Sequence, residues 1–456
     1  MRAVYFHFRW DRLSSGDDEM DSVWTKTAHL PQFEPLSGDI KTDVLIIGGG
    51  MAGLLCAFEL TRSGVDCVLV EADRLCGGIT KNTTAKITLQ HGLVYHKFIR
   101  EFGEDRARLY LQANAEAVGR YGALCKDIDC DFEERDSYVY STDDREILRQ
   151  EADALNRLGC AAELCDGLPL PIEVAGAVRV RAQAQFHPLK FISAICGGLN
   201  IFEHTKVREM VGNTAVTDKG RISAKKVIIA THFPFINKHG AYFLKMYQHR
   251  SYVLALEGAK RLGGIYVDGS GEGLSFRDFG ELLLLGGGSH RTGKRGGAWR
   301  ELEAFAAEHY PDAKVKYRFA TQDCMTLDGM PYIGRYSKNT PDLFVATGFN
   351  KWGMTSSAVA ADLLADMVMG RENRYAKVFD PSRTMLRPQL AVNAMEAVTN
   401  LFIPTVRRCP HLGCALKWNP EERSWDCPCH GSRFTEDGEL IDNPATGDIK
   451  TKKDRS

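Results

Sequence analysis

The chain has 456 residues, of which 44% are hydrophobic and 26% charged, and its formal net charge is −1. This length exceeds one ordinary core and predicts two or three domains. The balanced charge does not favour binding to nucleic acid or to an acidic membrane surface, and the absence of an eighteen-residue apolar run predicts no membrane-spanning helix. Nine of the thirteen cysteines are scattered, which is typical of reduced thiols and indicates a cytoplasmic protein.

The N-terminal 39 residues are expected to form an extension that precedes the first domain. Its first part is aromatic-rich and then acidic, and Met20 is an alternative start to Met1. This stretch has no apolar core region of the kind that a signal peptide needs.

A glycine-rich turn between a strand and a helix follows the extension. The run Val44–Ile47 suits a buried parallel strand, and Gly48-Gly-Gly-Met-Ala-Gly53 leads into a helical pattern that reaches Arg62. A second short strand ends at Glu71, 23 residues after Gly48. In this context the glycines allow close approach of a pyrophosphate, the helix N-terminus attracts its charge, and Glu71 would bind ribose hydroxyls. The alternative is a glycine-rich turn in an unrelated α/β fold.

Two later segments decide between FAD and NAD. The strand Lys226–Thr231 ends in small residues, and Asp328–Gly334 precedes Leu343–Thr355, which contains Gly348-Phe-x-x-x-Gly353 before a helix to about Met369. This order resembles the D-amino-acid-oxidase-like family of FAD-dependent amine and hydroxy-acid oxidoreductases, over about residues 43–370. The resemblance implies non-covalent FAD and a late helix N-terminus under the flavin, where it would stabilise negative charge on the reduced ring.

The fingerprint and the resemblance together define the expected FAD-binding residues. Thr84 and Lys86 would hydrogen-bond the flavin or serve a structural role, and Lys351 would be either a cation near the flavin or a solvated side chain. The full set is Gly48, Gly50, Met51, Ala52, Gly53, Glu71, Ala72, Gly78, Thr80, Thr84, Lys86, Val207, Ala230, Thr231, Gly334, Gly348, Phe349, Gly353, Met354 and Thr355.

The resemblance also implies an α/β, Rossmann-like FAD-binding domain with an inserted α+β substrate domain. The first is expected from segments 40–90, 187–235 and 326–370, and the second, an antiparallel sheet with helices, from 91–186 and 236–325. Strands are predicted over 137–141, 251–256 and 281–285, and a helix over 299–309. A carboxylate substrate favours an arginine fork, so the anchoring candidates, besides Lys351, are Arg250, Tyr252, Arg277, His290 and Arg291. Residues of these types more often have a surface or structural role, which is the alternative for each.

Two short boxes near the C-terminus carry the second cofactor signal. A linker with a helix, 371–401, leads to a β-rich module over 402–456 that contains Cys409-Pro-His411 and, fifteen residues later, Cys427-Pro-Cys-His430. Two cysteines and two histidines are the ligands of a Rieske [2Fe–2S] centre, whose imidazoles raise its potential. A Cys2His2 zinc site uses the same ligand types and is the rival interpretation.

The boxes resemble those of quinol-oxidising Rieske proteins. The resemblance implies Cys409, His411, Cys427 and His430 as iron ligands and a disulfide between Cys414 and Cys429. Phe434 stands where that family often has a tyrosine that hydrogen-bonds a cysteine sulfur, whereas the other hydroxyl donor, Ser432, is present. This difference predicts a lower potential than in the respiratory proteins. Only a short segment separates the linker helix from the first box, which leaves little room for the strands that usually precede it. The module is therefore expected to pack against the flavoprotein body.

The combined signals predict an FAD-dependent dehydrogenase. It would oxidise a small amine, amino acid or 2-hydroxy acid by hydride transfer and pass electrons singly to the cluster, then to an acceptor protein or a quinone. The alternatives are a reductase with electrons flowing from the cluster to the flavin, and a non-catalytic redox sensor. A homodimer is compatible with the sequence.

Overall fold

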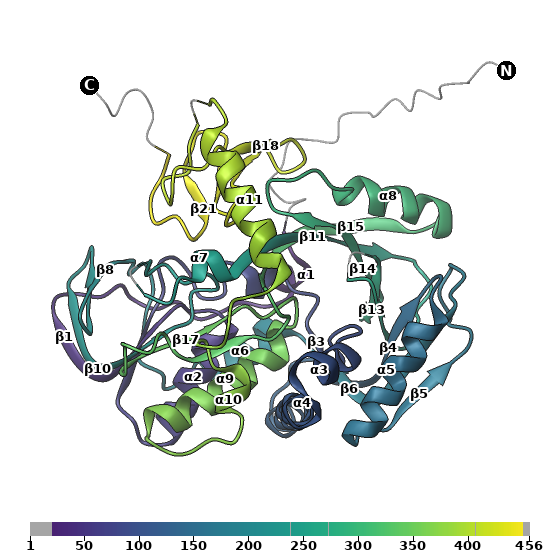
Figure 1. Cartoon of the computed structure of the whole chain (residues 1–456), viewed down its shortest axis with the longest axis horizontal. Helices are drawn as coiled ribbons and strands as arrows, with labels where there is room; N and C mark the ends of the chain where they lie inside the picture. Colours follow the sequence, from purple (N-terminus) through teal and green to yellow (C-terminus); the bar gives the residue numbers. More distant parts are fainter. Residues whose placement is uncertain (1–20, 238, 272, 406, 450–456) are drawn as a thin grey trace.

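The structure is a computed structural model that describes residues 21–237, 239–271, 273–405 and 407–449. Two large sheets lie side by side, and a small module with one helix sits on top of them (Figure 1). The expectation for the aromatic and acidic start of the chain falls outside the described residues. The next segment packs on the body, where Trp24 is fully buried and donates to the Thr83 carbonyl at 2.7 Å.

The first sheet has the doubly wound character that the glycine motif predicts. Its order is β16-β17-β10-β1-β2-β7, with β9 beside β10 and β8 beside β9. β1 pairs in parallel with both β10 and β2, while β16 and β9 join antiparallel. The strands are β1 (Ile40–Ile47), β2 (Cys67–Val70), β7 (Ile201–Phe202), β8 (Val207–Val211), β9 (Thr214–Thr217), β10 (Arg221–Ile229), β16 (Tyr332–Arg335) and β17 (Leu343–Thr347).

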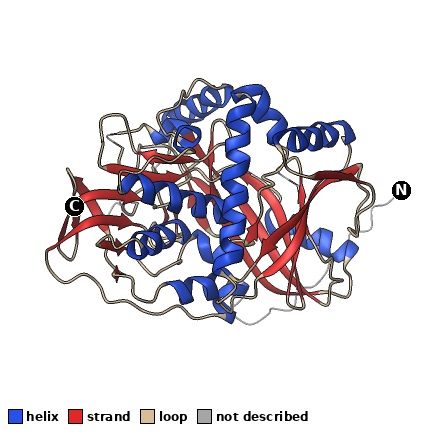
Figure 2. Ribbon diagram, turned by 90° about the horizontal axis from the view of Figure 1, so that it is seen from below, coloured by secondary structure: helices blue, strands red, loops and turns tan. Residues whose placement is uncertain are grey.

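Both faces of this sheet are covered, which explains why its strands are apolar throughout. On β1, Val44 and Ile46 belong to the main core, whereas Leu45 and Ile47 face a second core on the other side. α2 (Met51–Arg62) packs against α9 (Gly353–Val368), and α6 (Pro188–Ile195) lies beside α2; Figure 2 shows the helices from below.

The second sheet has nine strands in the order β15-β11-β14-β13-β12-β4-β6-β3, with β5 beside β6. All of its pairs are antiparallel except β4 with β12, so the expected antiparallel sheet contains one parallel pair. The expected strand over 281–285 begins at Leu282 and extends to Arg291. The strands are β3 (Lys86–Ile87), β4 (Glu133–Ser141), β5 (Ala162–Cys165), β6 (Gly176–Gln185), β11 (Met246–Glu257), β12 (Ile265–Asp268), β13 (Ser275–Phe279), β14 (Leu282–Arg291) and β15 (Lys314–Thr326).

Helices cover the second sheet and connect it to the first. The longest is α4, whose side chains Ala107, Tyr110 and Tyr121 enter the main core. No described helix is long and apolar enough to cross a bilayer. The remaining helices are α1 (Val23–Thr27), the 3₁₀ helix η2 (Ile79–Asn82), α3 (Tyr95–Phe102), α4 (Glu104–Leu124), α5 (Arg145–Leu158), α7 (Tyr242–Lys245), α8 (Ala298–His309) and α10 (Ala376–Phe379).

The C-terminal module consists of a helix, two cysteine-containing loops and a small antiparallel sheet. The helix is α11 (Pro388–Phe402), and the sheet order is β18-β19-β20-β21, formed by Lys417–Asn419, Ser424–Asp426, Arg433–Phe434 and Leu440–Asp442. The four cysteines of the boxes, Phe434 and Ile449 form its small core. Among described residues between 403 and 416 there is no strand, only a bridge from Arg408 to Ala415.

Candidate active site and cluster site

The glycine turn at the end of β1 lies at one end of the candidate FAD site. Gly48 has a φ of +114°, and a Cβ there would overlap the backbone of Ala230. Glu71 accepts a hydrogen bond of 2.6 Å from the Gly49 amide and one of 3.1 Å from the Asp73 amide. Burial raises the pKa of Glu71, although these amides oppose the shift. The turn and the acidic residue are therefore held together as one binding unit.

A cavity of about 1150 Å³ runs from this turn to the second sheet and to the C-terminal module. Most of the expected FAD-binding residues line it. They are Gly48, Gly50, Met51, Ala52, Glu71, Ala72, Gly78, Thr80, Thr84, Lys86, Val207, Ala230, Thr231, Gly348, Phe349, Gly353 and Met354. A volume of this size and a cradle of glycine backbone fit an extended dinucleotide.

Three residues of the expected FAD set do not line the cavity. A Cβ on Gly53 would overlap the Gly48 carbonyl, so this glycine allows the helix to pack against the turn. Gly334 lies on β16 against Pro381. The Thr355 hydroxyl is buried at 3.0 Å from His91 Nε2. These positions support the cavity wall from behind.

Charged groups of both signs line the part of the cavity beside the second sheet. Lys86 Nζ donates to the hydroxyls of Thr84 and Ser275, each at 3.1 Å, and burial lowers its pKa to about 7, with a further contribution from Arg277. Lys351 Nζ donates to the Gly271 carbonyl at 2.8 Å. On β15, burial raises the pKa of Asp323 to about 6, against the attraction of Lys351 and Arg250.

The expected arginine fork is not in this cavity, which corrects the sequence interpretation. Arg277 is buried and donates to the Thr84 and Ala85 carbonyls at 2.8 and 2.9 Å. Arg250 is ion-paired with Glu422 of the C-terminal module. Arg291 donates to the Pro428 carbonyl at 3.2 Å and to Asn393 at 2.9 Å.

The side chains of the remaining two candidates, His290 on β14 and Tyr252 on β11, also bind partners outside the cavity. His290 Nδ1 lies 2.9 Å from the Arg291 carbonyl, and its Nε2 lies 3.0 Å from the Tyr252 hydroxyl. Tyr252 is among the residues that line the cavity, but its hydroxyl donates to Glu422 at 3.0 Å. Of the six candidates, only Lys351 and Tyr252 contact the cavity.

The two boxes bring the four expected iron ligands together. The rings of His411 and His430 lie with centroids 5.0 Å apart and planes at 89°. Each has a buried Nδ1 without a hydrogen-bond partner in the described structure. The Cys409 thiol lies within hydrogen-bonding reach of the Cys427 sulfur and the Ser432 hydroxyl. Two imidazole nitrogens without partners and two cysteine sulfurs are the donor set that a Rieske cluster requires.

The extra cysteines of the boxes lie at the same place. The sulfurs of Cys414, Cys427 and Cys429 lie within 4.8 Å of one another. All four box cysteines are free thiols in the described structure, so the Cys414–Cys429 disulfide stays a prediction.

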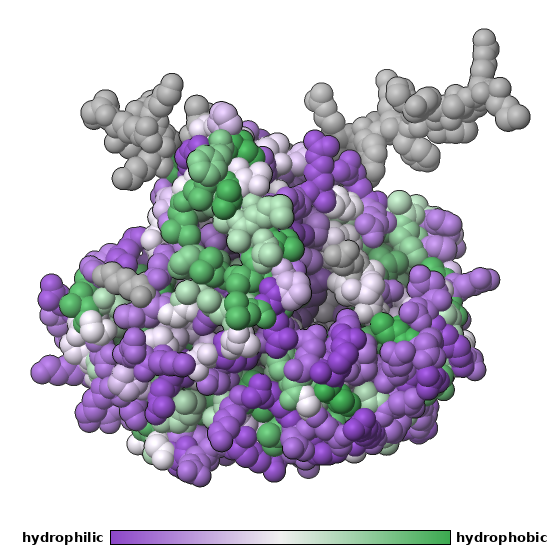
Figure 3. Space-filling view, in the orientation of Figure 1, coloured by the Kyte–Doolittle hydropathy of each residue, from purple (hydrophilic) through white to green (hydrophobic). Residues whose placement is uncertain are grey.

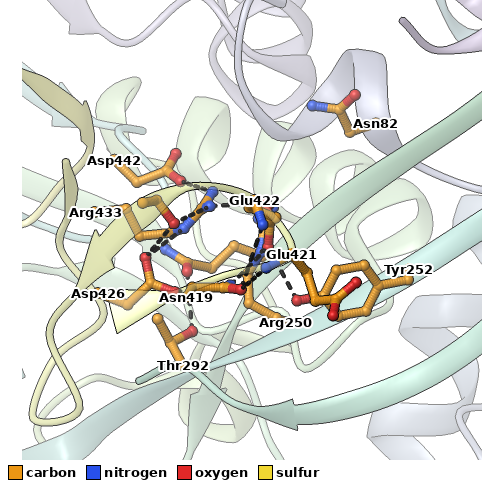
Figure 4. Close-up of polar contacts among 12 residues, drawn as sticks. Asn82, Arg250, Tyr252, Thr292, Asn419, Glu421, Glu422, Asp426, Arg433 and Asp442 are labelled. Carbon is orange, nitrogen blue, oxygen red and sulfur yellow. Dashed lines mark hydrogen bonds and ion pairs between the residues drawn. The ribbon is translucent and has the colours of Figure 1, made fainter. Parts of the chain in front are cut away.

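A buried ionic network joins the module to the second sheet (Figure 4). Glu422 pairs with Arg250 and, at 2.7 Å, with Arg433, which also pairs with Asp426 at 3.0 Å. Burial would raise the pKa of Glu422, but the two arginines outweigh burial and lower it to about 2. The network therefore holds a carboxylate in ionised form between the two parts.

Comparison with known families decides the classification of this fold and its two sites. The family model described as FAD dependent oxidoreductase matches residues 43–367, and the model described as Rieske [2Fe-2S] domain matches residues 382–453. The chain belongs to the FAD-dependent oxidoreductase family and carries a C-terminal Rieske domain. Its cofactors are accordingly FAD and a [2Fe–2S] cluster, and the zinc interpretation is set aside.

Some relatives match nearly the whole chain, and others match about three quarters of it. The oxidoreductase is 35% identical to YhfW of Bacillus subtilis, described as a Rieske 2Fe-2S iron–sulfur protein, over 94% of this chain and 97% of that protein. It is 25% identical to γ-glutamylputrescine oxidoreductase of Escherichia coli, over 75% and 87% of the two chains. The crystal structure of glycine oxidase from Geobacillus kaustophilus covers 75% of this chain and 99% of its own, with 20% identity and a TM-score of 0.64, and shows the same fold.

The sequence interpretation missed several residues that shape the oxidoreductase. His249 and Asp323 are directly paired neighbours on β11 and β15 and line the cavity. Gln248 and Gln322 hold the second box of the Rieske domain, and Glu422 anchors it. An acidic residue within a strand was the one available signal, and it did not reveal which face of the strand Asp323 occupies.

Proposed function

We propose that the protein is a dehydrogenase that oxidises a small amine, amino acid or 2-hydroxy acid and passes the electrons singly to its own Rieske cluster. The observation that carries this proposal is the shared cavity. Its wall includes the glycine turn at Gly48 and also Leu440–Asn443, Ala445 and Thr446 of the Rieske domain. Bound FAD would accept a hydride and release electrons one at a time. A common wall supports a short route between the two cofactors.

The charges in the cavity favour an amino acid among the three substrate classes. Arg74 is the one arginine among the described residues that line it, and it pairs with Glu203 at 3.1 Å. Four lysines also line the cavity, and two of them, Lys86 on β3 and Lys351 beside Ser289 of β14, lie at the second sheet, where they would attract a substrate carboxylate. Asp323 on β15, which lines the same cavity, would supply a negative charge for a substrate ammonium group. A lysine binds a carboxylate as a point charge, without the directional fork of arginine.

The contacts of the Rieske domain support electron flow within one chain. The second box is hydrogen-bonded to the body, and His430 lies with its ring 6.5 Å from that of Phe233, just after β10. A one-electron acceptor, protein or quinone, would then take electrons from the outer side of the cluster. The thiols outside the boxes are free in the structure, which supports a cytoplasmic location.

Anaerobic stopped-flow absorbance tests the proposal. Amines, amino acids and 2-hydroxy acids are mixed with the oxidised holoprotein while flavin and cluster absorbance are recorded together. We expect flavin bleaching by one amino acid class, followed by cluster reduction. Cluster reduction by an external donor that precedes flavin reduction would support the reverse flow and contradict the proposal. The absence of bound FAD from purified protein would support the sensor alternative.

A further inference from the structure

The helix α11 has its polar and apolar residues on unexpected sides. Asn393 and Asn400 are 6% and 3% exposed and face the protein. In contrast, Val392, Met395, Val398 and Phe402 are 46%, 67%, 55% and 81% exposed, at spacings of three and four residues that place them on one face. A helix on the surface of a globular protein normally shows the opposite arrangement.

The inward face of α11 is fixed by specific polar contacts, so the helix is not free to rotate. Asn393 Oδ1 accepts a hydrogen bond of 2.9 Å from Arg291. The Asn400 carbonyl accepts one of 2.9 Å from the Ala415 amide in the first box. The apolar outer face is therefore a stable feature of the fold, and something other than this domain would have to cover it.

This outer face is continuous with the surface of the cluster loop. A space-filling view shows apolar side chains gathered over α11 at the top of the molecule (Figure 3). Leu401, at the end of α11, and Leu412, beside the ligand His411, are each 41% exposed. Leu401 also packs close to Gly413. We call Val392, Met395, Val398, Leu401, Phe402 and Leu412 the apolar ridge.

Basic residues lie beside the ridge. They favour an occupant with an anionic surface over one that is apolar alone. Glu396 is the single acidic residue of α11 and is paired with Lys294 at 2.5 Å. Arg408 is exposed and donates to the carbonyls of Leu401, Ile403 and Gly413. Ile449 belongs to the core of the same domain, and the seven residues that follow it in the sequence include four basic and one acidic.

We propose that the apolar ridge docks on the surface of an anionic lipid bilayer. A projecting row of flexible apolar side chains with basic residues beside it suits insertion among acyl chains and attraction to anionic headgroups. The small net charge of the whole chain conceals this local pattern. Docking there would place the loop with His411 at the bilayer, where a lipid-soluble electron acceptor is dissolved. The lipid binding itself does not depend on the proposed enzymatic function.

Co-sedimentation with lipid vesicles tests this proposal on the full-length holoprotein. Vesicles of phosphatidylcholine alone are compared with vesicles that also contain phosphatidylglycerol, at low and high salt. The test variant combines Met395→Gln with Phe402→Gln, which removes apolar area without changing charge. Matched controls are Val211→Gln and Val315→Gln, whose side chains are 61% and 46% exposed on distant strands.

We expect the wild type to bind the phosphatidylglycerol vesicles, and to bind them more weakly at high salt. Partition of the double variant should be weaker by about tenfold or more, while both controls bind as the wild type does. Visible spectra of flavin and cluster verify that each variant is folded. No binding by the wild type, or equal binding by the folded double variant, overturns the proposal. A wild-type dimer that becomes monomeric in the double variant, without vesicle binding, would assign the ridge to a second copy and also overturn it.

Discussion

Gln248 on β11 donates a hydrogen bond of 2.7 Å to the backbone carbonyl of His430, so a strand of the second sheet holds an expected cluster ligand in place. On the neighbouring strand Gln322 donates to the Gly431 carbonyl at 2.9 Å. Gly431 has a φ of +85°, and a Cβ there would overlap Gln248. The second box therefore lies directly on the flavoprotein body.

Replacement of Gln248 should loosen the Rieske domain and leave the flavin domain unchanged. In Gln248→Leu the buried His430 carbonyl loses its partner, which costs about 1–3 kcal/mol. We expect the cluster's visible circular dichroism to be lost at lower urea concentration, while FAD release occurs at the wild-type midpoint. Gln150→Leu, at an exposed glutamine on α5, is the control and should change neither midpoint. Equal cluster midpoints in the wild type and Gln248→Leu would contradict this role.

The buried network around Glu422 should be more sensitive to loss of the acid than any surface ion pair. In Glu422→Gln, Arg250 loses its carboxylate partner while it remains 4% exposed, so the cluster domain should lose about 3–5 kcal/mol of unfolding free energy. Arg149→Met removes an exposed pair on α5 and should have no measurable effect. Urea unfolding followed by cluster absorbance measures both variants.

The same residue predicts the direction of an acid effect. The pKa of Glu422 is lowered to about 2 from its ordinary 4.5, so its contribution to stability is complete above pH 4.5 and is lost as the pH falls toward 2. The difference in unfolding free energy between the wild type and Glu422→Gln should therefore shrink in acid. A difference that stays constant or grows as the pH falls below 4.5 would show that Glu422 is not the ionised anchor.

Lys86 should control the flavin potential near neutral pH, if it lies at the flavin as the resemblance implies. Its pKa of about 7 means that it carries a proton below pH 7 and is neutral above it. A cation stabilises the reduced, more negative flavin, so the wild-type potential should fall more steeply with rising pH near 7 than that of Lys86→Met. Spectroelectrochemical titration measures this slope. Lys206→Met, at the β8 end of the cavity, should retain the wild-type slope.

The elements that were predicted well have signals that are local in the sequence. A parallel strand buried on both faces is apolar throughout, so β1 and β10 were visible in the sequence without knowledge of their neighbours. The boxes of the Rieske domain were equally visible, because ligand types and spacing are local. The helix predicted over 299–309 begins at Ala298, and the strand predicted over 251–256 is part of the longer strand Met246–Glu257.

The orientation of side chains on β11 could not be predicted. The alternation of a strand places Gln248, Arg250 and Tyr252 on one side and Tyr247, His249 and Ser251 on the other. The sequence does not reveal which side faces the cavity, and the first set contacts the Rieske domain. Arg250 was assigned to a substrate for that reason. A domain that docks from another part of the chain leaves no local signal on the strand that receives it.

Phe434 offers a test of how side chains near the sulfurs set the cluster potential. Its ring is fully buried among the box cysteines. In Phe434→Tyr a hydroxyl that reaches a ligand sulfur should raise the potential by tens of millivolts, since 59 mV of a one-electron couple corresponds to about 1.4 kcal/mol. Protein-film voltammetry measures the shift. An unchanged potential would mean that the hydroxyl does not reach a sulfur.

Removal of an expected cluster ligand should abolish the cluster and leave FAD binding intact. His430→Ala deletes an imidazole whose Nδ1 has no other partner in the described structure, so the cluster should not assemble. FAD should still bind, because Gly48, Gly50 and Glu71 lie in the loops that follow β1 and β2 of the first sheet, outside the Rieske domain. Iron content and flavin absorbance of the purified variant measure both outcomes.

Kinetics of the same variant then test whether the cluster lies on the electron path. Substrate should bleach the flavin of His430→Ala in a single turnover at the wild-type rate, because the cavity residues beside the second sheet are unchanged. Steady-state turnover with a one-electron acceptor should collapse, since no cluster is left to relay the electrons. His239→Ala, at an exposed histidine after β10, is the matched control and should turn over normally. Turnover of His430→Ala at the wild-type rate would remove the cluster from the electron path, and the shared cavity wall would then need another explanation.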